Sequence, residues 1–257
     1  MPPDIPEFSP LEEPVIYAPV LEKPERVPFW GYLDLAMVIG LLVASVAIIL
    51  MVVGGLLFVY PGLKDNQGPL LLPTQFALYA FLYLSFRLVF GFKYGKPVFA
   101  SLGWRRSHFN LAIAAAGGVL LAFLVSALAY LIHTPKVASP VESLMNSPAL
   151  LAVFGVMAVT VAPLFEELLF RGFLQPLLSR TFGVAAGILM TAIVFGALHA
   201  PEYSYAWQYA LAVSIVGAVL GWVRFTSNSI IPSTVMHGFY NAVFVIALAA
   251  SKLKLIE

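Results

Sequence analysis

Two adjacent glutamates and an arginine interrupt a long apolar stretch of the sequence. Glu166, Glu167 and Arg171 lie between about Leu150 and Leu178, where most other side chains are apolar. A charge at membrane depth costs about 2.5 kcal/mol or more, so three such residues together indicate a function. On a helix, Glu167 and Arg171 are four residues apart and share a face, which predicts an ion pair. Glu166 lies about 100° further round the helix and is left as the carboxylate available for chemistry.

Two of the four histidines lie in later apolar segments, each with a patterned neighbour. Phe195 and His199 are four residues apart, as are His237 and Asn241, so each pair shares one helical face. Singly, such a histidine is most often an interfacial residue, and such an asparagine can simply hold two helices together. Counting the helical rise from the segment ends places Glu166 and these polar residues at similar depth. We therefore expect the four polar side chains to converge near the middle of a bilayer.

These residue types suit the hydrolysis of a peptide bond. A carboxylate in a low-dielectric site can take a proton from water near neutral pH, and a neighbouring histidine can hold that water. A second histidine and an asparagine amide can donate hydrogen bonds to an oxyanion. The alternative use of the same groups is as ligands of Zn²⁺, which would itself supply the activated water.

The composition is that of a polytopic membrane protein. Of the 257 residues, 61% are hydrophobic and 11% are charged, with a mean hydropathy of +0.92. A soluble domain carries roughly 25% charged residues. The net charge of +1 gives no support for a nucleic-acid partner. The absence of cysteine excludes disulfides, thiolate metal sites and a cysteine nucleophile.

Seven apolar segments are long enough, or nearly so, to cross the ~30 Å hydrocarbon layer as helices. The fourth is overlong, and a kink at Pro163 would divide it. We predict an all-α transmembrane bundle of seven spans, or eight if the fourth segment is two. The segments are 33–60, 70–91, 109–132, 149–178, 183–199, 207–224 and 229–250.

The chain divides into a tail and a membrane domain. Residues 1–30 hold eight prolines and six acids, a composition that cannot bury a core and predicts an extended tether. Residues 31–257 form the membrane domain, with the motifs in a core of about 100–250. Basic residues gather in the loop between the second and third segments, which predicts that this loop and the amino terminus are cytoplasmic. They are Lys93, Lys96, Arg105 and Arg106.

Three motifs, in this order on late membrane segments, resemble those of the CPBP or Abi family, which includes the type II CAAX prenyl proteases and many bacterial relatives. Each motif alone is weak evidence for the family, whereas the three motifs in this order and at membrane depth are specific for it. The resemblance covers roughly residues 100–250, and a stretch before the third segment also resembles the family's usual lead-in. The motifs and this stretch are Glu166-Glu167-x-x-x-Arg171, Phe195-x-x-x-His199, His237-x-x-x-Asn241 and Ser101-Leu-Gly-Trp104-Arg-Arg106.

The resemblance implies an intramembrane endopeptidase. Glu166 and His199 would activate the water, and His237 and Asn241 would form the oxyanion site. The residues that would support this site structurally are Glu167, Arg171 and Phe195.

The same resemblance leaves the metal open, because the family was long described as metalloproteases. A zinc site would have to use Glu166, His199 and His237, with Asn241 as a poor fourth ligand. Ligand histidines also need partners for their second nitrogen, and the flanking residues offer none. We therefore expect no cofactor and a metal-free mechanism, with zinc as the alternative. The flanking residues are Ala200, Met236 and Gly238.

The expected substrate is a membrane-associated protein or peptide, cut near its C-terminus or in a leader. Eukaryotic enzymes of the family act on prenylated C-terminal peptides, and a bacterial member would more plausibly process a leader or sorting peptide. We expect an integral protein of the bacterial inner membrane. Two other interpretations stay open: a non-catalytic family member acting as a binding or immunity partner, and an ion-coupled transporter. A transporter would usually show internal repeats, which are not visible in the sequence.

Overall fold

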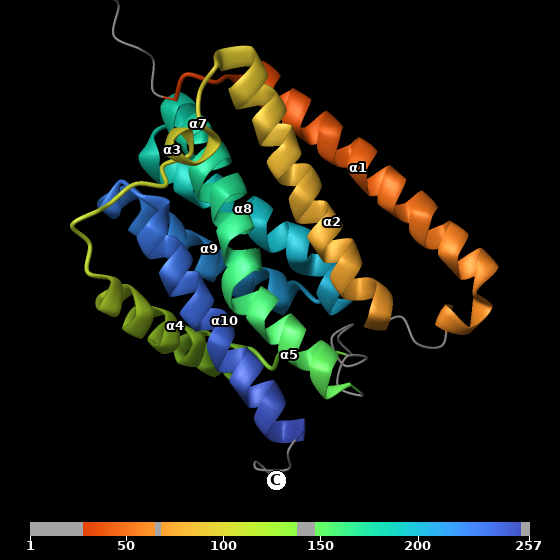
Figure 1. The fold of residues 1–257 in the computed structure, drawn as a ribbon. Coiled ribbons are helices and arrows are strands. Elements are labelled where there is room, and N and C mark those ends of the chain that lie inside the picture. Colours follow the sequence, from red (N-terminus) through yellow and green to blue (C-terminus); the bar gives the residue numbers. More distant parts are fainter. Residues whose placement is uncertain (1–27, 65–67, 138–146, 253–257) are drawn as a thin grey trace, which may run out of the picture.

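The computed structural model describes residues 28–64, 68–137 and 147–252, and this part of the chain is helical with no strand (Figure 1). Most of the predicted tail, residues 1–27, lies outside the described residues. In chain order the helices are α1 (Tyr32–Val59), α2 (Gly68–Phe86), α3 (Val98–Ser101), α4 (Leu111–Leu131), α5 (Pro148–Val156), α6 (Ala162–Glu167), α7 (Gln175–Phe182), α8 (Val184–His199), α9 (Trp207–Ser227) and α10 (Ile230–Lys252).

Seven helical stretches of the described chain are long and apolar enough to cross a membrane, which confirms the predicted transmembrane helical bundle. The fourth stretch, Pro148–Phe182, is one helical run of 35 residues rather than two spans. It is built from α5, α6 and α7, joined by two π-helical turns at Met157–Val161 and Leu168–Leu174. We call this run the fourth span. Among the described residues the count is therefore seven, the lower of the two predicted numbers.

Each π-helical turn presents a backbone carbonyl to a side chain from a distant part of the chain. The Ala158 carbonyl accepts a hydrogen bond from Asn241 Nδ2 at 2.8 Å. The Phe173 carbonyl accepts one from the indole Nε1 of Trp30 at 3.1 Å. A π-helical turn is rare and is frequently found at a functional site. These two turns tie the fourth span to α10 on one side and to the segment before α1 on the other.

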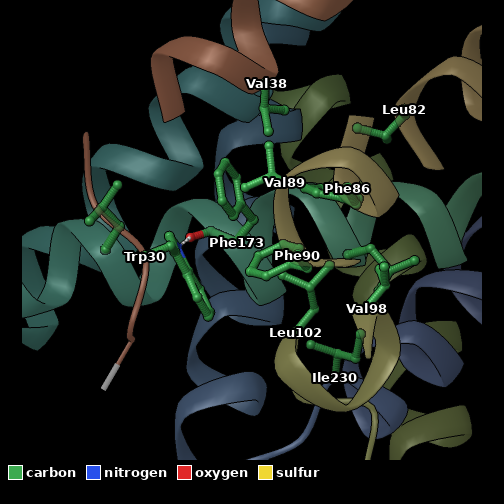
Figure 2. Packing of buried hydrophobic residues seen from close by; sticks show 12 residues of the cluster. Trp30, Val38, Leu82, Phe86, Val89, Phe90, Val98, Leu102, Phe173 and Ile230 are labelled. Carbon is green, nitrogen blue, oxygen red and sulfur yellow. Dashed lines mark hydrogen bonds between the residues drawn. The ribbon is translucent and has the colours of Figure 1, made fainter. Parts of the chain in front are cut away.

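An aromatic cluster packs around the C-terminal half of the fourth span. Trp30 stacks on Phe173, and both rings meet Phe90, which lies in the helical turn after α2 (Figure 2). Phe86 completes the cluster through edge contacts with Phe173. In Figure 1, α1 lies at the outer edge of the bundle and packs mainly on α2. The cluster therefore fixes the first two spans against the helix that carries the glutamates.

Close backbone contacts hold α10 between α4 and the fourth span. A Cβ atom at Gly118 of α4 would collide with the Met236 carbonyl. A Cβ atom at Gly238 would lie 2.6 Å from the Val159 carbonyl of the fourth span. Both positions therefore require glycine. Because Met236 and Gly238 flank His237, these contacts fix the backbone that carries this histidine.

Candidate active site

The structure brings the four expected site residues to one cavity. Glu166 of the fourth span, His199 of α8, and His237 and Asn241 of α10 all line a cavity of about 810 Å³. The cavity is large enough for several residues of a peptide and lies in the volume range of ligand pockets. Its remaining wall is mostly apolar. The helical periodicity and depth of the motifs therefore predicted the convergence of these side chains.

The side chains of Glu166 and His237 lie close together in the lining of the cavity. Glu166 Oε2 lies 3.7 Å from His237 Nε2, which is within ion-pair distance but beyond a hydrogen bond. The Glu166 side chain is 22% exposed, whereas that of His237 is 5% exposed. Glu166 is therefore the carboxylate that the contents of the cavity can reach.

Glu167 lies behind His237 and holds it. Its Oε1 accepts a hydrogen bond from Arg171 Nη1 at 2.8 Å, so the expected pair is present with both side chains fully buried. The same oxygen lies 3.2 Å from His237 Nδ1. A carboxylate only accepts, so His237 carries a proton on Nδ1 and presents Nε2 towards Glu166. Arg171 Nη2 also donates to the Gly217 carbonyl of α9 at 3.1 Å, which anchors this row of groups to a third helix.

His199 is oriented by the backbone of its own helix. Its Nδ1 lies 2.7 Å from the Phe195 carbonyl. A carbonyl cannot donate, so Nδ1 carries the proton and the neutral ring keeps a lone pair on Nε2. The Phe195 ring packs against His199 at 4.6 Å and against His237 at 5.9 Å between ring centres. Arg171 lies over the same ring at 4.5 Å, so Phe195 packs between His199 and the buried ion pair.

The expectation that the imidazoles lack partners is wrong. The sequence argument considered only the flanking residues Ala200, Met236 and Gly238. The partners come instead from the carbonyl one helical turn before His199 and from Glu167 on another helix. This removes one of the arguments against a metal.

Asn241 is less free than an oxyanion donor would be. Its Nδ2 donates to the Ala158 carbonyl in the first π-helical turn, so one of its two amide hydrogens is already used. Only the second hydrogen remains for a ligand in the cavity. Asn241 therefore joins α10 to the fourth span and lines the cavity at the same time.

The cavity also contains polar residues that the sequence analysis missed. Glu202, three residues after His199, lines it and lies within electrostatic range of His199 and Glu166. Tyr79 of α2 lines it as well, next to Glu166, and stacks on Phe165 with 5.1 Å between ring centres. The i,i+3 spacing of His199 and Glu202 could have indicated a shared face, had the helix been continued beyond His199.

The number and positions of the donor groups do not favour a metal ion at these residues. Among the described residues, no three His, Asp or Glu side chains gather closely enough to hold a metal ion. Glu166 and His237 approach each other, but no third His, Asp or Glu of the described residues joins them at one point. A zinc site needs three or four ligands directed at one point. The donors that the described part of the chain brings together do not meet that requirement.

Residues 147–243 match the family model described as type II CAAX prenyl endopeptidase Rce1-like. The match begins just before the fourth span and ends shortly after Asn241, so it contains all the expected site residues. No curated protein and no solved structure matches the chain.

Proposed function

Because the chain belongs to the family of CAAX-type proteases, we propose that it is an endopeptidase that hydrolyses a peptide bond within the membrane. The observation that carries the proposal is the shared cavity of Glu166, His199, His237 and Asn241. It combines a reachable carboxylate, a histidine with a free nitrogen lone pair and two potential oxyanion donors. The substrate is a membrane-associated protein or peptide.

Glu166 and His199 activate the water in this proposal. The Nε2 lone pair of His199 accepts a hydrogen bond from the water and orients it. Glu166 takes the other proton as the water oxygen attacks the peptide carbonyl carbon. The C–N bond then breaks, and Glu166 returns its proton to the leaving amine.

His237 and Asn241 stabilise the oxyanion. Since Nδ1 of His237 already donates to Glu167, Nε2 can donate only when the ring is an imidazolium. Glu166, whose Oε2 lies 3.7 Å from Nε2, compensates that positive charge. Asn241 contributes its remaining amide hydrogen. Preorganised donors of this kind typically contribute 10²–10³-fold to the rate.

We further propose that the amino terminus faces the cytoplasm of a bacterial cell. Basic side chains from several segments meet at the end of the bundle where α1 begins. Lys93 pairs with Asp34 in the first turn of α1 at 2.5 Å, and Arg180 donates to the Pro28 carbonyl at 2.5 Å. Arg105 donates to the Asn228 carbonyl in the turn before α10 at 2.7 Å. This grouping supports the positive-inside argument.

Cleavage by the full-length protein in lipid nanodiscs tests the function. The substrate is a peptide mixture made by digesting a proteome with a glutamate-specific protease, and new termini are identified by mass spectrometry. We expect bonds that the wild type cuts and Glu166→Gln does not. Equal cleavage by both proteins would contradict the proposal.

Elemental analysis of the active protein tests whether the mechanism is metal-free. We expect no stoichiometric transition metal and unchanged turnover after exhaustive chelation. About one zinc per chain, with activity lost on stripping and restored by Zn²⁺, would reassign Glu166, His199 and His237 as ligands.

A further inference from the structure

The side chains that line the cavity carry a net negative charge, because Glu166 offsets the imidazolium proposed for His237 and Glu202 remains. Its ionisable lining consists of Glu166, Glu202, the two histidines and several tyrosines, with no lysine or arginine of the described chain among the lining residues. A cavity with low-dielectric walls and a net charge concentrates ligands of the opposite sign. The cavity therefore has a potential that favours a positively charged group.

Glu202 forms no salt bridge with a lysine or arginine of the described chain. It lies in the 3₁₀ turn Ala200–Tyr203 that follows α8, and its residue surface is exposed. By contrast, the buried carboxylate behind the cavity, that of Glu167, is neutralised by Arg171. The ionisable groups that act on the Glu202 carboxylate are His199 and Glu166. Glu202 is thus an uncompensated carboxylate beside the groups proposed to act on the peptide bond.

An aromatic wall stands next to this carboxylate. Tyr203 and Tyr209 stack with 4.3 Å between ring centres and 7° between ring planes, and both line the cavity. Tyr209 is fixed by a hydrogen bond of 3.0 Å from its hydroxyl to the Pro135 carbonyl. Aromatic faces attract lysine and arginine side chains, so a carboxylate beside two such rings suits a cation.

The turn that places these groups has an unusual backbone. Ser204 and Tyr205 both have left-handed conformations, with φ of 52° and 60°. Residues with a Cβ rarely adopt this conformation, and two in succession reverse the chain sharply. The Tyr205 N–H closes the turn on the Ala200 carbonyl at 2.8 Å. The turn holds Glu202 one residue before Tyr203, close to the end of α8 and therefore to His199.

We propose that Glu202 is a specificity-determining residue that selects substrates with a lysine or arginine side chain within two residues of the scissile bond. The proposal rests on the proposed peptidase function. Proximity to Glu166 and His199 sets the distance from the reacting bond. Tyr203 and Tyr209 contact the methylene or guanidinium part of the same side chain. A glutamate side chain at that position of the substrate is repelled.

The first experiment maps the preference. Full-length protein in nanodiscs cleaves the peptide mixture made with the glutamate-specific protease, in which lysine and arginine remain internal. We expect lysine or arginine to be enriched within two residues of the bonds that wild type cuts and Glu166→Gln does not.

The second experiment measures the contribution of Glu202. The best-cleaved sequence is synthesised with lysine, with its uncharged analogue norleucine and with glutamate at the preferred position. A charge-assisted contact of this type is worth about tenfold or more, so we expect kcat/KM for the lysine peptide to exceed that for norleucine by this factor. Glu202→Gln should abolish the difference and leave norleucine turnover within about twofold of wild type. Glu202→Lys should favour the glutamate peptide.

Different outcomes identify different errors. A wild type that cleaves peptides without a cation preference, or a preference that survives Glu202→Gln, would overturn the specificity role and leave the peptidase intact. An equal loss for all three peptides in Glu202→Gln would also overturn it, and would assign Glu202 to the support of His199. No cleavage that depends on Glu166 would overturn the proposed function and the inference together.

Discussion

The two halves of the fourth span have opposite surroundings. From Pro148 to Glu166, the buried residues are Gly155, Met157 and Pro163. The next twelve residues are mostly buried: Glu167, Leu168, Phe170, Arg171, Gly172, Phe173, Gln175, Leu177 and Leu178. The first half lines the cavity and the second half packs against the aromatic cluster (Figure 2).

The boundary between the halves falls between the two glutamates. Glu166 is the carboxylate on the cavity side, and Glu167 is the one on the packed side, bonded to Arg171 and His237. Two adjacent carboxylates thus acquire different roles from their surroundings alone. The packed half therefore holds the cavity half in place. Variants in the packed half should therefore change stability, and variants in the cavity half should change turnover.

The largest effect is expected from breaking the buried pair. Glu167→Ala leaves Arg171 buried without its counter-charge and removes the partner of His237, at a cost of about 3–5 kcal/mol in the free energy of unfolding. Turnover should be lost as well. The measurement is the denaturation midpoint in detergent, with Arg171→Met as the reciprocal variant. Normal stability of both would show that the pair does not support the fold.

Glu166→Gln should show most clearly that the two halves differ, because it should lower turnover without lowering stability. The change keeps the size of the side chain and removes the proposed base, so turnover should fall about 10²–10⁴-fold. The denaturation midpoint should stay within error of the wild type, because Glu166 forms no buried ion pair with arginine or lysine in the described chain. A loss of stability comparable to that of Glu167→Ala would erase the distinction between the two glutamates.

The sequence could predict what depends on local periodicity. The spans follow from apolar runs, and the Glu167–Arg171 pair follows from i,i+4 spacing on one helix. The arrival of His237 and Asn241 at the same cavity follows from depth. These features need only the rise and pitch of a helix and the thickness of a bilayer.

Contacts between distant segments could not be predicted in this way. The bond between Glu167 and His237 joins residues 70 positions apart, and that between Trp30 and Phe173 joins residues 143 apart. Both depend on the rotation of one helix against another and on π-helical turns that periodicity does not indicate. Glu202 was missed for a simpler reason, because the predicted fifth segment ended at residue 199 and the helical backbone continues as a 3₁₀ turn.

Gly238→Ala should lower both the stability and the turnover of the protein, with an effect between those of the other variants. The new methyl group would lie 2.6 Å from the Val159 carbonyl and would push α10 away from the fourth span. Overpacking of this kind costs about 1–3 kcal/mol in the free energy of unfolding, and the shift of His237 should also lower turnover. The matched control is Gly40→Ala in α1, where nothing lies within 4 Å. The control should keep full activity; an equal effect of both substitutions would refute the contact argument.

The smallest effect is expected from Trp30→Phe, which tests the packed half alone. The change keeps an aromatic ring in the cluster but removes the N–H that binds the Phe173 carbonyl. Leaving that buried carbonyl without a donor costs about 1–3 kcal/mol in the free energy of unfolding. Turnover at low temperature should stay near the wild-type value, because the second π-helical turn lies on the packed side of Glu167.

A matched control separates the buried hydrogen bond from general damage to this region. Tyr32→Phe removes the exposed hydrogen bond from the Tyr32 hydroxyl to Thr181 Oγ1, which is 2.7 Å long. An exposed group exchanges its partner for water, so this variant should lose no more than about 0.5 kcal/mol. If Trp30→Phe lowered turnover as strongly as stability, the packed half would have to take part in the chemistry. If the two variants were equally stable, the carbonyl of the π-helical turn would not need its indole partner.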